Sequence, residues 1–176
     1  MGDPGLGYLQ SQSCHVDESN ENSLPVIDDI RDVSIPILTP FILTGIAIDA
    51  DQNDVLSYTW EQIDNGTVGF YDFGPLQQTG ATFRSLRPSG TGVRYMPKLS
   101  SVLSGNLTVE NPDVDSSWET LSAVPRDLNF GFTVRDNAVG GGGVTLAKKK
   151  VSVVDNGGAF VITSPASGRT YLAGSS

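Results

Sequence analysis

The chain has few of the side chains that most catalytic and zinc sites require. Its 176 residues include one cysteine, Cys14, and one histidine, His15. Zinc sites usually draw on several histidines or cysteines, and the His-Glu-x-x-His pattern of zinc peptidases is absent. Adjacent residues in an extended segment do not easily face each other, so we expect no Cys–His catalytic pair. Cys14 also has no disulfide partner within the chain. We therefore expect this chain to be no enzyme and to bind no zinc.

Positive charge and long apolar runs are also scarce. The chain has 11 lysines and arginines against 20 aspartates and glutamates, a formal net charge of -9, and its sequence pI is about 4.3. Such a surface repels phosphate backbones, which argues against a nucleic-acid partner. No apolar stretch has the length of a membrane span, and the first residues lack a signal-peptide pattern. The composition suits a secreted, extracellular protein.

Helical periodicity is missing, and short alternating segments stand in its place. We expect strands at residues 33–37, 41–48, 56–62, 128–134 and 145–154. Pro36 suits an edge strand, where no ladder donor is needed. Leu56, Tyr58 and Trp60 share one strand face, so Trp60 is the best candidate for a central core residue. In strand 128–134 the alternation places four residues inward: Leu128, Phe130, Phe132 and Val134.

The order of these segments predicts an all-β fold, an immunoglobulin-like antiparallel β-sandwich. We expect a linker or tail at 1–22, the sandwich at 23–156, and a following module or C-terminal tail at 157–176, beginning with a strand at 160–165. A long irregular insertion, rich in Gly, Pro and Ser, is expected at about 64–127, with short strands at 94–96 and 107–109. Loops of that length are unusual in compact domains, so we expect a structured insertion or a functional surface.

The acidic run from Asp49 to Asp54 joins two of the expected strands. Asp and Asn oxygens grouped on a tight loop are ligands that Ca²⁺ prefers. The run is not an EF-hand, because Asp54 stands at the turn glycine, Trp60 stands at the closing glutamate, and strands replace the helices. A solvated acidic turn is the alternative, since Asp and Asn are common turn residues.

Two other segments are expected at the same end of the sandwich. Asp136 follows a long inward-facing strand, and Asn22 and Ser23 lie where the chain enters the domain. Carboxylates gathered there would repel one another without a bound cation. The sequence thus predicts a structural calcium site with five candidate ligands: Asn22, Ser23, Asp49, Asp51 and Asp136.

Several motifs occur in a family-like order. Segments 35–45 (Ile-Pro-Ile-Leu-Thr-Pro-Phe-Ile-Leu-Thr-Gly), 47–51 (Ala-Ile-Asp-Ala-Asp), 56–62 (Leu-Ser-Tyr-Thr-Trp-Glu-Gln) and 133–137 (Thr-Val-Arg-Asp-Asn) carry the likeness. Gly74-Pro75, 83–85 and 128–130 continue it, as does the segment 160–165. Together they resemble the non-catalytic region of secreted bacterial reprolysin-like zinc metallopeptidases, a region similar to cadherin-like and polycystic-kidney-disease (PKD) domains.

The resemblance implies an extracellular module that follows a protease domain and often binds calcium. The ligand positions of calcium-binding PKD modules match the five candidates above. The insertion departs from a minimal PKD module and puts the strand count in doubt. The zinc-binding helix of the peptidase is absent, so the resemblance assigns no proteolysis to this chain.

Three functions follow from these expectations. The first is a calcium-binding accessory module of a secreted zinc metallopeptidase, a spacer, stabiliser or substrate-targeting domain. Its partners would be the catalytic protease domain of the parent chain and extracellular protein or polysaccharide substrates. The second is an extracellular adhesive module that binds protein or carbohydrate through residues 64–126. In that region Arg84, Arg87, Arg94 and Lys98 either contact an acidic partner or pair with local carboxylates. The third is an independent hydrolase that uses carboxylates.

Overall fold

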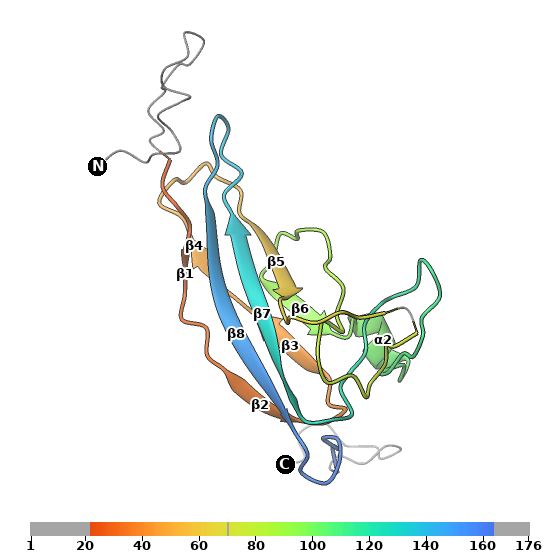
Figure 1. Ribbon diagram of the computed structural model, residues 1–176. Coiled ribbons are helices and arrows are strands. Elements are labelled where there is room, and N and C mark those ends of the chain that lie inside the picture. The colour runs from red at the N-terminus through yellow and green to blue at the C-terminus, as the bar shows by residue number, and fades with distance from the viewer. Residues whose placement is uncertain (1–21, 70, 164–176) are drawn as a thin grey trace, which may run out of the picture.

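In the computed structural model, residues 22–69 and 71–163 are described (Figure 1). The strands in these ranges are β1 (Val26–Ile27), β2 (Val33–Pro36), β3 (Phe41–Thr44), β4 (Ala47–Ile48), β5 (Ser57–Gln62), β6 (Val93–Met96), β7 (Arg126–Arg135) and β8 (Val144–Val154). A single helical turn, α2 (Leu99–Leu103), is the helix of these ranges. It falls far short of a membrane-crossing helix, and no other described segment qualifies as one. The all-β class is confirmed.

The largest sheet has the strand order β2-β8-β7-β5. The long β7–β8 hairpin and the β5–β7 pair are antiparallel, whereas β2 runs parallel to β8. The prediction of a wholly antiparallel arrangement is therefore wrong at this edge. No hairpin joins β2 to β8, so nothing forces these strands to run in opposite directions. Pro36 does lie on an edge strand, as predicted, opposite Val154.

Two small sheets are built from the early strands β1, β3 and β4 and from β6, which lies in the long segment between β5 and β7. β3 pairs with β6, and β1 pairs with β4. The single strand expected at 41–48 is therefore divided, because Gly45 and Ile46 carry the chain from one small sheet to the other. Gly45 donates its N–H to the oxygen of Gly92 at 2.9 Å. A Cβ at Gly45 would lie 2.4 Å from the ring of Phe132, so only glycine fits this crossing.

The core lies between the large sheet and the two small ones. Leu128, Phe130, Phe132 and Val134 are at most 1% exposed, and the inward alternation predicted for this strand is confirmed. Trp60 is also confirmed as a core residue, 3% exposed and stacked on Phe132 at 4.5 Å. Leu43, Ala47 and Met96 add the contribution of the small sheets. In Figure 1, β3 and β4 pass behind β7 and β8, in agreement with this shared core.

Buried polar contacts organise the long segment between β5 and β7. The Arg94 guanidinium, on β6, donates to the oxygens of Trp60 and Arg84, at 2.6 Å each, and forms an ion pair with Glu119 at 2.8 Å. The side-chain oxygen of Gln62 accepts the N–H groups of Thr82 and Phe83 at 2.8 and 3.0 Å. The segment is thus held against β5 at two places, through Gln62 and through the backbone of Trp60.

The two strands predicted inside this segment have different outcomes. The prediction at 94–96 corresponds to β6, which pairs with β3 as part of the core. The prediction at 107–109 is wrong, because these residues make isolated contacts in place of a ladder. Leu107 accepts the N–H of Leu121 at 3.1 Å, and the N–H of Val109 donates to the Thr120 hydroxyl at 3.0 Å.

The predictions at the two ends of the chain are only partly open to comparison. Phe160–Thr163 form no strand, and Ser164 and Pro165 lie outside the described residues. Residues 1–21, with Cys14 and His15, also lie outside them. All described strands fall within the expected module at 23–156.

Candidate metal centre

Three segments meet at one end of the large sheet. They are the entry residues before β1, the loop between β4 and β5, and the turn between β7 and β8, which Figure 1 shows together near the N-terminal side of the molecule. Asn137, at the start of the β7–β8 turn, fastens two of them. Its amide nitrogen donates to the oxygen of Val55 at 2.6 Å, and its φ of 58° turns the chain out of β7. Chain segments far apart in sequence are therefore fixed side by side.

The loop after β4 folds back on itself through its own aspartates. The N–H of Asp51 donates to one carboxylate oxygen of Asp49 at 2.9 Å, the usual contact of an Asx turn. The N–H of Asp54 then donates to the backbone oxygen of Asp51 at 3.1 Å. These contacts place Asp49 and Asp54 on the same side of the loop, facing the end of β7.

Asp136 lies immediately after β7 and is completely buried. Its carboxylate accepts the N–H of Ala138 at 3.0 Å and the N–H of Gly143 at 2.8 and 2.7 Å to its two oxygens. The amide of Asn22 donates to it at 2.7 Å. A Cβ at Gly143 would lie 2.7 Å from this carboxylate, so the tight turn depends on glycine there. The buried carboxylate of Asp136 is thus surrounded by hydrogen-bond donors from Asn22, Ala138 and Gly143, a set of contacts called the Asp136 cradle below.

Asp49, Asp54 and Asp136 form a group in which one oxygen from each lies within 4.8 Å of the others. One oxygen of Asp49 and one of Asp54 are buried and have no hydrogen-bond partner. Buried polar atoms in folded proteins are nearly always satisfied, and an unsatisfied carboxylate oxygen is costly. Unpartnered oxygens on clustered carboxylates are the arrangement that a bound cation would complete.

The ionisation of the group is uneven. Burial raises the pKa of Asp54, and the nearby carboxylates of Asp136, Asp49 and Asp51 raise it further. The hydrogen bond from Asn22 and those from the backbone of the β7–β8 turn lower the pKa of Asp136 despite its burial. Asp136 is therefore held as an anion, while a neighbouring positive charge would favour the ionised form of Asp54.

The five residues predicted as ligands all lie at this end of the sheet, but they make different contacts. Asp49 and Asp136 contribute carboxylate oxygens to the close group. Asn22 contacts Asp136 through its amide nitrogen. Asp51 is not a member of the close group, and one of its carboxylate oxygens accepts the backbone N–H of Ser23 at 2.7 Å.

Asp54 is the residue that the sequence prediction omitted. An alternating Asp-x-Asp pattern suggests Asp49 and Asp51 as the pair, whereas the turn brings Asp49 and Asp54 together. The spacing contains a signal for it: Asp54 stands three residues after Asp51, and Asp is common in such turns. Here the turn brings the side chain of Asp54 back to that of Asp49.

The donor set fits a hard cation. Every atom of the group is a carboxylate oxygen, and the described residues contain no cysteine or histidine that could supply a thiolate or an imidazole. Oxygen ligands from flexible loops are characteristic of Ca²⁺, whereas Zn²⁺ sites are built mainly from nitrogen and sulfur. If calcium binds here, Asp49, Asp54 and Asp136 would hold it.

Comparison of the chain with protein-family models, with curated proteins and with solved structures gave no match. The family resemblance therefore rests on the ordered motifs of the sequence.

Proposed function

We propose that this chain is a calcium-binding, non-catalytic accessory module of a secreted zinc metallopeptidase, with an immunoglobulin-like, PKD-like β-sandwich fold. The observation that carries the calcium part is the group of Asp49, Asp54 and Asp136, with two buried oxygens that lack a partner. In this proposal Asn22, Ser23 and Asp51 contribute the remaining oxygens. The resemblance described above supports the extracellular setting and the parent protease.

Calcium would cross-link chain segments that are far apart in the sequence. Its three carboxylate ligands come from the β4–β5 loop and from the end of β7, and Asn22 ties the entry segment to the same place. A cation shared by these segments holds the entry to the domain in one direction relative to the large sheet. This is what a spacer needs at its junction with a preceding domain, where a loose connection would allow the two domains to reorient.

The cation would also stabilise the fold by mass action, because the ligands are brought together only in the folded state. Extracellular calcium modules commonly have Kd values of about 0.1–1 mM. With free calcium at a hundred times Kd, the stabilisation is about 2.7 kcal/mol. For a domain of this size that corresponds to a rise in Tm of about 5–10 °C.

Thermal melts in calcium and in chelator test the proposal. We expect the wild-type Tm to rise with calcium, the Asp54→Asn variant to lose that rise, and the Asp113→Asn variant to keep it. Asp113 is an exposed aspartate outside the metal group, so it controls for a general loss of negative charge. Equal Tm values for the wild type in calcium and in chelator would contradict the proposed site.

A further inference from the structure

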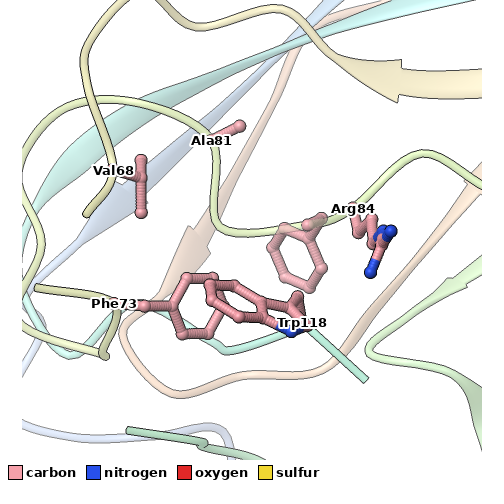
Figure 2. A pocket seen from close by; sticks show the side chains of 6 residues that line it. Val68, Phe73, Ala81, Arg84 and Trp118 are labelled. Carbon is pink, nitrogen blue, oxygen red and sulfur yellow. The ribbon is translucent and has the colours of Figure 1, made fainter. Parts of the chain in front are cut away.

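A cavity of about 360 Å³ opens in the segment between β5 and β7, and no part of the calcium proposal uses it. Figure 2 shows Val68, Phe73, Ala81, Arg84 and Trp118 around it, and Phe83 completes the lining. Small-molecule sites usually have volumes of about 300–1,000 Å³. The cavity therefore has room for one small ring system.

The walls of the cavity are aromatic and fixed. Phe73 is 3% exposed and packs edge-on against Trp118, with ring centroids 5.1 Å apart. Phe83 is 2% exposed, and its ring centroid lies 6.0 Å from that of Phe41 and 6.3 Å from that of Phe130, both part of the core packing. The floor is thus part of the hydrophobic core, and aromatic walls of this kind favour a flat aromatic guest.

Arg84 is the one charged residue of the lining. Its backbone N–H donates to the oxygen of Trp118 at 3.0 Å, which fixes the arginine next to the aromatic wall. The guanidinium forms no ion pair with any carboxylate of the described residues. An unpaired guanidinium beside an apolar cavity is suited to a carboxylate, which it can bind with two parallel hydrogen bonds.

Glu119, an acidic residue on the neighbouring segment, already has other partners. Glu119 stands opposite Phe83 in an isolated bridge. One of its oxygens accepts from Arg94 at 2.8 Å, and the other accepts the N–H of Lys98 at 3.0 Å. Arg94 therefore neutralises Glu119 and leaves Arg84 for a ligand. The net charge of -9 disfavours multiply charged anions, so a single negative charge matches this site best.

We propose that the cavity lined by Phe73, Phe83, Arg84 and Trp118 binds a small aromatic monocarboxylate, with the ring between the aromatic walls and the carboxylate on Arg84. This binding site is independent of the proposed calcium site.

The two tryptophans provide a direct test with 2-naphthoate as the probe. In a ¹⁵N-labelled sample the indole N–H signals of Trp60 and Trp118 report separate places, and the Trp118→Phe variant assigns them. Trp60 is buried and donates to the oxygen of Gly92 at 3.0 Å, so its signal should stay unchanged. We expect the Trp118 signal to shift in a saturable manner at submillimolar to millimolar probe. Absence of a Trp118 shift at about 5 mM naphthoate overturns the proposal.

The carboxylate contact is tested with charge variants and a neutral probe. Arg84→Gln should weaken naphthoate binding about fivefold or more at low ionic strength. Arg87→Gln removes an exposed arginine that lies outside the cavity lining, and it should change binding less than about twofold. The neutral 2-naphthamide should bind the wild type about fivefold more weakly than naphthoate does, and Arg84→Gln should erase that difference. Equal effects of the two arginine variants, or equal affinities of the two probes for the wild type, overturn the assignment of the carboxylate to Arg84. Arg84 is exposed, so its variant is expected to fold, and an unchanged Tm confirms this.

Discussion

Replacing Glu119 with glutamine should destabilise the protein strongly, because it leaves Arg94 as a buried cation. The side chains of this pair are 4% and 8% exposed, and their contact is 2.8 Å. Arg94 also donates to two backbone oxygens, and Glu119 also accepts the N–H of Lys98. Glutamine keeps the shape but offers one acceptor oxygen, so either Arg94 or Lys98 loses its partner in either amide orientation.

The size of the effect follows from the burial of the pair. Removing one partner of a buried ion pair costs about 3–5 kcal/mol, because the remaining charge is uncompensated. Domains have total stabilities of about 5–15 kcal/mol, so this loss is a large share. It corresponds to a fall in Tm of about 10–15 °C for a domain of this size.

The assay is equilibrium unfolding in urea, followed by tryptophan fluorescence, with Asp29→Asn as the matched control. Asp29 forms an ion pair with Arg31 at 3.1 Å, but these side chains are 76% and 87% exposed. Exposed pairs contribute about 0–1 kcal/mol, so the control should unfold close to the wild type. If Glu119→Gln and Asp29→Asn lose the same small amount, the reasoning from burial is wrong.

Three further predictions concern close contacts and pH. Gly92→Ala should lower the free energy of unfolding in urea by about 3 kcal/mol or more, because the new Cβ would lie 2.0 Å from the oxygen of Gly45. The control Gly90→Ala should leave it nearly unchanged, because nothing lies within 4 Å of that Cβ. Equal stabilities of the two variants would contradict this. Gly143→Ala should weaken calcium binding about tenfold in calorimetry by displacing the Asp136 carboxylate, and unchanged affinity would show that the Asp136 cradle does not matter. Because the pKa of Asp54 is raised, the calcium-free protein loses stability as the pH rises through that pKa. In chelator, Asp54→Asn should therefore raise Tm at about pH 7.5. At about pH 3, below the pKa of an ordinary aspartate, the same variant should change Tm little. The lowered pKa of Asp136 has the opposite effect: its stabilisation is present above the pKa of an ordinary aspartate and is lost as the pH falls through the lowered pKa. If the Tm difference between Asp54→Asn and the wild type does not change with pH, the role assigned to Asp54 is wrong.

The all-β class and the β7 core face were predictable because they depend on local alternation. In β7 every second residue from Leu128 to Val134 is apolar, and a period of two puts these four residues on one face of the sheet. Trp60 followed from the same rule. The division of the strand expected at 41–48 was not predictable, because it depends on the approach of Gly45 to Gly92, a contact set by the tertiary fold.

The end of the sheet at which the candidate metal centre lies was predictable, but the three carboxylates that form its close group were only partly so. The acidic loop and the residue that ends β7 were both identified, since strand ends that share an edge gather their side chains. Asp54 was missed because turn closure, which the Asp-x-Asp pattern does not specify, selects it over Asp51. The pairing of Arg94 with Glu119 was likewise beyond local patterns, since the two residues are 25 positions apart and meet only through tertiary packing.

Calcium binding itself is measured most directly by isothermal titration calorimetry of the chelator-treated protein. The group of Asp49, Asp54 and Asp136 predicts one calcium ion per chain, with a Kd at or below about 1 mM. Absence of binding at several millimolar calcium would show that these carboxylates share a solvated acidic turn and hold no metal.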